Sequence, residues 1–425
     1  MAWKEMDVME LRCRFVLDYQ SGKWTMAELC RRYGISRPCG YKWVARYAEE
    51  GAKGLEDRSR RPQHCPHGVD KATEDVIAAL RDEYPKWGAR KLRAKLQERE
   101  PGRVWPASST IGDVLSRRGL TVPRRHRRGA EPSSAEPLGE DLQANDVWSI
   151  DYKGWFRTGD GRRCDPLTLQ DAASRYALRC QGLERPSYSD TRRVMQAAFR
   201  EYGLPRAIRS DNGQPFASVG LGGLTRLSVW WVRLGIEPTR IRPGRPQENG
   251  RHERFHRTLK EATASPPAAT IRAQQARFDR FLKEFNEERP HEALGRRPPA
   301  SYYTPSPRPY PSRIAPLEYP AQMQVRSVHE HGQFRFQGVR FFLGHAFANQ
   351  PIGLMAIEKR YWLVYFAHLL LGVADVNTHR ILTPAQARKR VPDYESAMHY
   401  ISSTVMPSPR GGHQGKDPER SAPTA

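Results

Sequence analysis

Three acidic residues, far apart in the sequence, stand in local settings that suit metal-assisted chemistry on a phosphate. Asp151 lies in Trp-Ser-Ile-Asp-Tyr, Asp211 in Arg-Ser-Asp-Asn-Gly, and Glu253 in Gly-Arg-His-Glu-Arg. Phosphodiester chemistry needs an activated attacking oxygen and a stabilised leaving oxygen, and two carboxylate-bound divalent ions supply both. Mg²⁺ prefers oxygen ligands and retains water and substrate phosphate, so three converging carboxylates suffice. The pattern indicates phosphoryl transfer on DNA or RNA.

Each acid taken alone also has an ordinary interpretation. Asp211 begins an Asp-Asn-Gly sequence that is common in turns, and a glutamate on a helix, such as Glu253, is usually a solvated charge. Asp151 follows Ile150 in a strand that we expect to be partly buried, where a carboxylate needs a partner or a metal. Glu248 is an alternative third acid.

The overall charge favours a polyanionic partner. The chain has 425 residues, with 70 Lys and Arg against 47 Asp and Glu, for a formal net charge of +23. Lys and Arg that neutralise phosphates release counterions, so a nucleic acid is the expected partner. No apolar run reaches the ~18 residues of a membrane span, and the start of the chain lacks the apolar region of a signal peptide. We therefore expect a cytoplasmic protein, nucleoid-associated if bacterial.

The N-terminal region is expected to bind DNA. Residues 5–50 predict three helices, the second of which begins with a capping box of Thr25 and Glu28. Gly34 ends that helix and Ser36 caps the next, which is the helix-turn-helix layout. The last helix would enter the major groove. An ordinary small helical bundle is the alternative.

A second helical unit, also of helix-turn-helix type, is predicted over 70–128, and the Pro- and Ser-rich stretch after it is expected to be a linker. From Val147 the pattern alternates strands and helices, which predicts an α/β layer with a mixed sheet. Short strands from 322 to 366 suggest a small β-barrel. From about Arg388 the polar, Pro-rich sequence predicts a disordered tail.

These elements allow the three acids to converge. Asp151 lies within the first predicted strand, and Asp211 follows the short predicted strand 207–210. Glu253 lies in the first turns of a helix predicted over 248–261. Neighbouring strands bring their ends to one edge of a sheet, so we expect the three carboxylates to meet there.

The motifs that carry these acids resemble a known family in their order. The matching segments are 147–151, 210–213, 246–254 and 286–294. Together they resemble the catalytic core shared by retroviral integrases and the DDE transposases of bacterial insertion sequences. In that family the third acid follows the Gly of Pro-Gln-x-x-Gly by three residues, which selects Glu253 over Glu248. The 41 residues between Asp211 and Glu253 exceed the usual family spacing, and the Gly-rich stretch 219–224 accounts for the excess.

The resemblance implies an RNase H-like fold in which Asp151, Asp211 and Glu253 bind two Mg²⁺ (or Mn²⁺) ions and are catalytic. It implies that water cleaves the element's 3′ end and that the freed hydroxyl joins target DNA, in a homo-oligomer acting on double-stranded DNA. The alternatives are an inactive DNA-binding regulator derived from a transposase and an RNase H-like nuclease. The catalytic-core helix, His252 and His256 included, is expected to face DNA. The predicted DNA-binding residues are Arg37, Tyr41, Lys42, Arg46, Arg124, Arg125, Arg251, Arg254, Arg257 and Lys260.

The fold class that follows is multidomain: all-α helix-turn-helix units, an α/β RNase H-like mixed-sheet core and a small β-barrel-like domain. The predicted boundaries are 1–55 and 70–128 for the two helical units, 143–295 for the catalytic core, 316–386 for the β domain, and 387–425 for the disordered tail.

Overall fold

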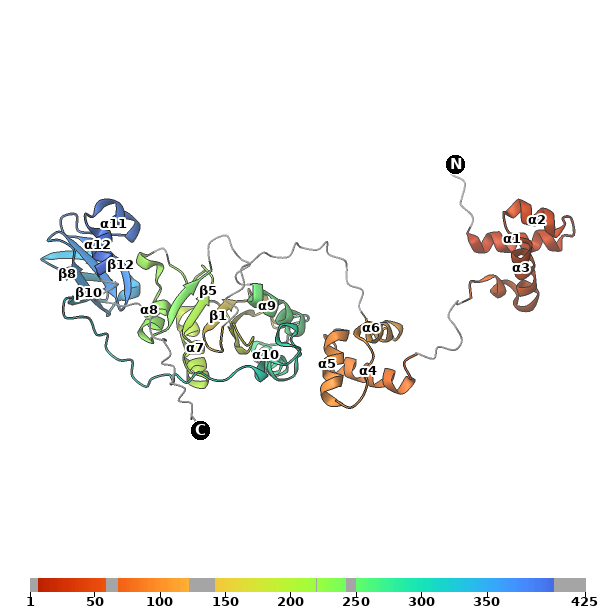
Figure 1. Cartoon of the computed structure of the whole chain (residues 1–425), viewed down its shortest axis with the longest axis horizontal. Helices are drawn as coiled ribbons and strands as arrows, with labels where there is room; N and C mark the ends of the chain where they lie inside the picture. Colours follow the sequence, from red (N-terminus) through yellow and green to blue (C-terminus); the bar gives the residue numbers. More distant parts are fainter. Residues whose placement is uncertain (1–6, 59–67, 122–141, 219, 242–249, 401–425) are drawn as a thin grey trace, which may run out of the picture. The chain divides into compact units, whose positions relative to one another are not determined.

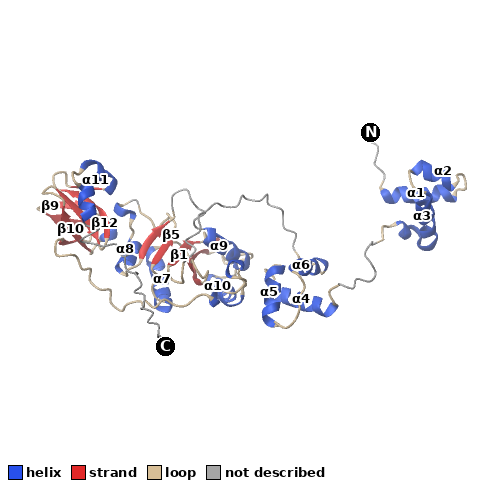
Figure 2. Cartoon of the chain, viewed as in Figure 1, coloured by secondary structure: helices blue, strands red, loops and turns tan. Residues whose placement is uncertain are grey.

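The computed structural model describes residues 7–58, 68–121, 142–218, 220–241 and 250–400. The chain divides into two compact units, 1–70 and 71–425, and each is described by itself. Figure 1 labels their helices and strands, and Figure 2 separates helix from strand by colour. Within the described ranges, no helix is both long enough and apolar enough to span a membrane.

The first unit is a three-helix bundle with the predicted helix-turn-helix layout. It comprises α1 (Val8–Gln20), α2 (Met26–Tyr33) and α3 (Arg37–Glu50), followed by the short helix η1 (Gly51–Leu55). Thr25 and Glu28 form the predicted capping box, and Gly34 ends α2 in the left-handed conformation at φ 64°. Ser36 occupies the N-cap position of α3, but its side chain makes no capping hydrogen bond. Trp43 of α3 is buried in the core of the bundle.

The second helical unit comprises α4 (Lys71–Glu83), α5 (Ala89–Arg99) and α6 (Ser108–Arg117). It contacts the catalytic-core region through the loop between α4 and α5 and the start of α5. The buried Trp87 donates from Nε1 to Glu284 Oε1 at 2.7 Å, and Lys91 Nζ donates to the main-chain oxygen of Pro290 at 2.6 Å. Arg90 pairs with Glu292 at 2.8 Å. The contacts of Arg90 and Lys91 join α5 to the segment 286–294, which carries the last of the motifs that resemble the integrase and transposase family.

The central sheet is mixed, as predicted. Its strands are β1 (Val147–Tyr152), β2 (Phe156–Arg157), β3 (Arg163–Asp171), β4 (Ala177–Leu183), β5 (Ala207–Ser210) and β6 (Glu237–Arg240). β3 pairs antiparallel with β1, β2 and β4, whereas β1–β5 and β5–β6 are parallel. The predicted first strand, 147–156, is interrupted because Gly154 has a φ of 85°, so β2 is separate.

Helices cover both faces of this sheet. Residues of α7 (Tyr188–Tyr202) and α8 (Arg226–Arg233) pack with Trp148 and Ile150 of β1 in the largest apolar cluster. On the other face, Phe255 of α9 (Gly250–Thr263) and Phe278 of α10 (Ile271–Lys283) pack on Cys164 and Cys180. α10 ends earlier than predicted, and a π-helical turn, Glu284–Glu288, continues it. Since side chains alternate along a strand, Asp151 and Thr168 lie on the α9 face.

A buried polar network fixes the start of β1. Asp171, fully buried, accepts hydrogen bonds from the main-chain N–H of Asn145 and from both the N–H and the hydroxyl of Ser174, at 2.6–2.8 Å. Asn145 Oδ1 in turn accepts from Trp148 Nε1 at 3.1 Å and from the Tyr303 hydroxyl at 2.9 Å. This network ties β1, the β3–β4 turn and the connector after the core together.

The C-terminal domain is a β structure. Five strands form an antiparallel sheet in the order β13-β12-β11-β10-β7, and β8 pairs with β9 in a separate hairpin. Among the described residues, no strand of the five-stranded sheet pairs with the hairpin to close a barrel. The barrel therefore remains a prediction. The strands are β7 (Gln324–Ser327), β8 (Gln333–Phe336), β9 (Val339–Phe342), β10 (Pro351–Ala356), β11 (Tyr361–Phe366), β12 (Leu369–Asp375) and β13 (Arg380–Leu382).

The predicted disordered tail, 387–425, is wrong over its first part. Helices α11 (Pro384–Arg390) and α12 (Tyr394–Tyr400) follow the sheet. Val391 and Tyr394 are buried against β11 and β12, and this burial orders a segment whose polar composition suggested otherwise. Residues 401–425 lie outside the described ranges.

An ion pair in this domain predicts a pH-dependent stability. Arg360 donates to both carboxylate oxygens of the buried Asp375, at 2.7 and 2.8 Å, and these bonds lower the pKa of Asp375 to about 2. Because the folded pKa is depressed, the stabilisation is present above the unfolded pKa of ~4 and is lost as the pH falls towards 2. Asp375→Asn should lower the unfolding free energy by about 1 kcal/mol at pH 7, after solvent screening of Arg360. Denaturant titrations of both proteins at pH 7 and pH 3 should show this difference shrinking; an equal difference at both pH values contradicts the prediction.

Candidate active site

Two of the three predicted acids lie side by side at the carboxyl ends of parallel strands. β1 and β5 pair in register from Val147 with Ala207 to Ile150 with Ser210. Asp151 is the next residue of β1, and Asp211 directly follows the end of β5, so the two positions are neighbours at one edge of the sheet, as predicted. The Asp151 side chain lies on the face covered by α9.

A tight turn holds the Asp211 carboxylate. Its Oδ1 accepts a hydrogen bond from the main-chain N–H of Gly213 at 3.1 Å. A Cβ at position 213 would lie 2.9 Å from Asp211 Oδ2, so a larger residue there would displace the carboxylate. Asn212 Nδ2 donates to the main-chain oxygen of Ile241 at 3.1 Å, just beyond β6. The Asp-Asn-Gly sequence is an ordinary turn and also fixes an acid at the strand end.

Glu253 lies on the exposed face of α9. With 3.6 residues per turn, Glu253 shares this face with Arg257 and Lys260, and all three are exposed. His252 and His256 are buried and recur four apart on the face that packs on the sheet. Within the described residues, two groups bring three ligand atoms within 4.8 Å of one another: Asp151, His252 and His256, and the exposed His329, Glu330 and His331. The three predicted acids do not form such a group.

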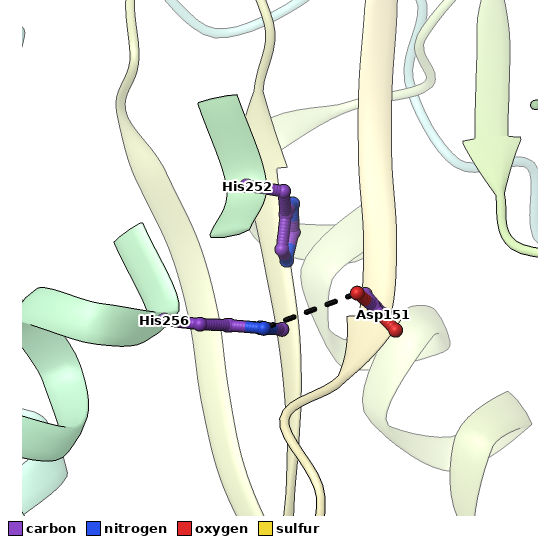
Figure 3. Close-up of side chains that lie close together, drawn as sticks. All are labelled: Asp151, His252 and His256. Carbon is purple, nitrogen blue, oxygen red and sulfur yellow. Dashed lines mark ion pairs between the residues drawn. The ribbon is translucent and has the colours of Figure 1, made fainter. Parts of the chain in front are cut away.

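The Asp151 cluster is built around one hydroxyl. Thr168 of β3 lies opposite Asp151 in the β1–β3 ladder, and its Oγ1 is 2.7 Å from Nε2 of both His252 and His256. His256 Nδ1 lies 3.9 Å from Asp151 Oδ2, and Figure 3 shows this imidazole directed at the carboxylate. Burial lowers the pKa of His252 to about 3 and that of His256 to about 2. Both rings are therefore neutral at physiological pH.

The hydrogen-bond donors and acceptors in this cluster are arranged so that it fits a cation. Thr168 Oγ1 has one proton and lies 3.0 Å from the main-chain oxygen of Asp151, which only accepts. When the Thr168 hydroxyl donates to this main-chain oxygen, both imidazoles donate to Thr168 Oγ1 from Nε2. The Nδ1 atom of each imidazole then carries no proton and is an acceptor. His252 Nδ1 is buried without a hydrogen-bond partner, and His256 Nδ1 faces the carboxylate. Carboxylate oxygen and imidazole nitrogen are both ligands of divalent transition metals, whereas Mg²⁺ prefers oxygen ligands.

The prediction that His252 and His256 face DNA is wrong, because both side chains are buried, with relative exposures of 1% and 6%. Their spacing with Phe255 and Leu259, which are also buried, forms a helical stripe typical of a packed face. The spacing of this stripe could have been read from the sequence. The arginines beside it led to the wrong prediction, because a run of charge suggests a solvated helix.

The remaining predicted DNA-binding residues divide by location. On α3, Arg37, Tyr41 and Lys42 are exposed, whereas Arg46 is half-buried with its guanidinium 5.2 Å from the Trp43 ring centre. Arg124 and Arg125, together with the alternative acid Glu248, lie outside the described residues. On α9, Arg254, Arg257 and Lys260 are exposed, and the half-buried Arg251 donates to the main-chain oxygen of Ala172 at 3.2 Å.

Comparisons with known proteins match domain models over several regions of this chain. Residues 141–246 and 234–299 match two integrase core domain models, and 323–382 match the C-terminal domain of IS481 family transposases. Residues 11–63 match a helix-turn-helix domain and 39–115 a homeodomain-like domain. These matches confirm the helix-turn-helix units, the integrase-like core and the resemblance to insertion-sequence DDE transposases.

Two relatives of this chain come from insertion elements. The chain is 28% identical over 259 residues to an uncharacterized 31.7 kDa protein of insertion element IS407 from Burkholderia multivorans, covering 60% of this chain and 90% of that one. It is 25% identical over 279 residues to an uncharacterized 39.2 kDa protein of IS476 from Xanthomonas euvesicatoria, covering 65% and 78%. Among solved structures, the HTLV-2 integrase catalytic core domain in complex with magnesium matches at 15% identity and a TM-score of 0.31, covering 38% and 99%.

Proposed function

We propose that this protein is a DDE transposase that binds the ends of an insertion sequence, cleaves the element's 3′ ends and joins them to target DNA. The observation that supports this most is the side-by-side position of Asp151 and Asp211 on parallel strands. The helix that carries Glu253 packs on the same face, because its His256 contacts Asp151. The match of residues 323–382 to the C-terminal domain of IS481 family transposases supports DNA transposition as the reaction.

In this proposal Asp151, Asp211 and Glu253 hold two divalent ions, Mg²⁺ or Mn²⁺. Bound ions of this kind stabilise the charge on the attacking and leaving oxygens of an in-line displacement. The protein's own contribution is position. Thr168, His252 and His256 fix α9, the helix that carries Glu253, against β1 and β3. Such positioning supplies a large part of catalysis in displacement reactions.

DNA binding in the proposal uses two exposed surfaces. The Arg37, Tyr41 and Lys42 face of α3 reads the element end from the major groove, as helix-turn-helix recognition helices do. On α9, Arg257 and Lys260 share the face of Glu253 and bind phosphates beside the reacting one. Arg124 and Arg125 add phosphate contacts between the second helical unit and the core. Two element ends must be processed together, so the active form is a homo-oligomer.

The test uses labelled duplex DNA that carries the inverted repeats flanking the coding sequence. The purified full chain should nick the 3′ ends in the presence of Mg²⁺ or Mn²⁺ and join them to a second duplex. Binding of the ends without cleavage in either metal would instead identify a DNA-binding regulator. Preferential hydrolysis of the RNA strand in an RNA–DNA hybrid would identify an RNase H-like nuclease.

A further inference from the structure

A cavity of about 480 Å³ lies beside α9, on a different face from Glu253. α9 contributes Arg251, Arg254 and Thr258, which recur at intervals of three and four and so share one side of the helix. The other walls are α5, the β3–β4 turn and the segment after the π-helical turn. Its charged lining residues are Lys91, Arg175, Arg251, Arg254, Arg289 and Glu292.

The charges in this cavity are not balanced. Glu292 is the one acid among the described lining residues, and it is exposed and pairs with Arg90 at 2.8 Å. Behind the lining, Glu284 lies 4.0 Å from Arg289 and Asp171 attracts Arg175, so the cations still outnumber the acids around them. Burial, with added repulsion from Arg251 and Arg254, lowers the pKa of Arg175 to about 10. Burial, with added repulsion from Arg289, lowers the pKa of Lys91 to about 8. Cations held together in this way destabilise one another until an anion joins them.

Two polar atoms in the cavity wall lack protein partners. Arg175 Nε and His291 Nε2 are buried and have no hydrogen-bond partner among the described residues. Arg175 also has a left-handed backbone at φ 65°, a conformation that is uncommon for a non-glycine residue. Gln170 holds this turn by donating to the main-chain oxygen of Arg175 at 2.9 Å. A strained backbone together with a buried, unpartnered Nε atom is typical of a ligand-binding residue.

We propose that this cavity binds one backbone phosphate of the DNA, outside the reacting position. Phosphate oxygens accept several hydrogen bonds at once, and guanidinium groups match them with paired N–H donors. A DNA phosphate fits the location because Arg251 and Arg254 flank Glu253 in sequence, so a strand that reacts at Glu253 passes close to the cavity. Lys91 belongs to the second helical unit, so the same phosphate contacts α5 and α9. The assignment to DNA rests on the proposed function.

The test compares DNA affinity over a range of salt concentrations, in an Asp151→Asn background so that cleavage does not interfere. Arg175→Asn removes the guanidinium, and asparagine tolerates the left-handed backbone. Arg254→Gln changes an exposed residue, so its folding is not at risk. Each variant should reduce the slope of log affinity against log salt by about one, the effect of one lost phosphate contact. The matched control is Arg272→Gln on α10, an exposed arginine outside the cavity, which should leave the slope unchanged.

A second arm uses inorganic phosphate alone. At equal ionic strength, phosphate should raise the melting temperature of the Asp151→Asn protein above that in chloride, and Arg175→Asn should remove this increase. The proposal is overturned if both cavity variants leave the slope of log DNA affinity against log salt unchanged. If phosphate still stabilises the protein in that case, the cavity binds small anions and not DNA. Since neither arm measures cleavage, a failure of the proposed function and a failure of this site give different results.

Discussion

Replacing Asp211 by Asn, or Glu253 by Gln, should abolish both cleavage and strand transfer while leaving binding to the element ends nearly unchanged. Each substitution removes one charged metal ligand and keeps the shape of the side chain. Bound divalent ions supply several kcal/mol of transition-state stabilisation, so the rate should fall by roughly a thousandfold or more. Gel assays of labelled end DNA measure cleavage and joining, and fluorescence anisotropy measures binding.

The matched control for Glu253 lies on the same helix. Glu261 is an exposed glutamate near the end of α9, and Glu261→Gln removes the same charge without touching the predicted acids. It should retain cleavage within a few-fold of the wild-type rate. Full strand transfer by the Glu253→Gln protein contradicts the assignment of the third acid.

Replacing Asp171 by Ala should produce the largest loss of stability among substitutions outside the apolar core. The change leaves the N–H of Asn145 and both donors of Ser174 without an acceptor in a buried region. An unsatisfied buried donor costs about 1–3 kcal/mol, so the unfolding free energy should fall by roughly 3–5 kcal/mol. Denaturant unfolding followed by tryptophan fluorescence measures it, because Trp148 is part of the network.

A graded control comes from Ser174→Ala, which removes only the hydroxyl donor of the same network. It should cost about 1 kcal/mol. If Asp171→Ala and Ser174→Ala unfold at the same denaturant concentration, the carboxylate does not organise the start of β1. Cleavage should also fall in Asp171→Ala, since β1 carries Asp151.

Strongly patterned elements were predictable from the sequence. β5, Ala207–Ser210, has the predicted bounds because Gly203 and Pro205 end the previous helix and Asp-Asn-Gly ends the strand. The capping box at Thr25 is likewise a local feature. Strands β12 and β13 and helix α12 were not predicted individually, because their order comes from contacts with β11 rather than from local sequence.

The sequence predicted which elements carry the three candidate acids, and it did not predict what surrounds them. The order of the three motifs and the strand ends at Asp151 and Asp211 follow from turn and strand patterns that lie within a few residues. The Thr168 hydroxyl between His252 and His256 joins positions 84 and 88 residues apart, and no local pattern in the sequence specifies such a contact. The basic cavity has the same origin, since Lys91 and Arg175 meet only through the packing of separate elements.

Helix α9 has a structural or functional role on three of its sides, and this limits which substitutions it tolerates during evolution. One side is packed on the sheet through His252 and His256, a second lines the basic cavity, and a third presents Glu253, Arg257 and Lys260. A surface helix normally has one side on which substitutions are nearly neutral, and this helix lacks one along most of its length. A library of random variants selected for transposition should therefore accept very few changes in α9, and α10, with its exposed outer side, should accept many.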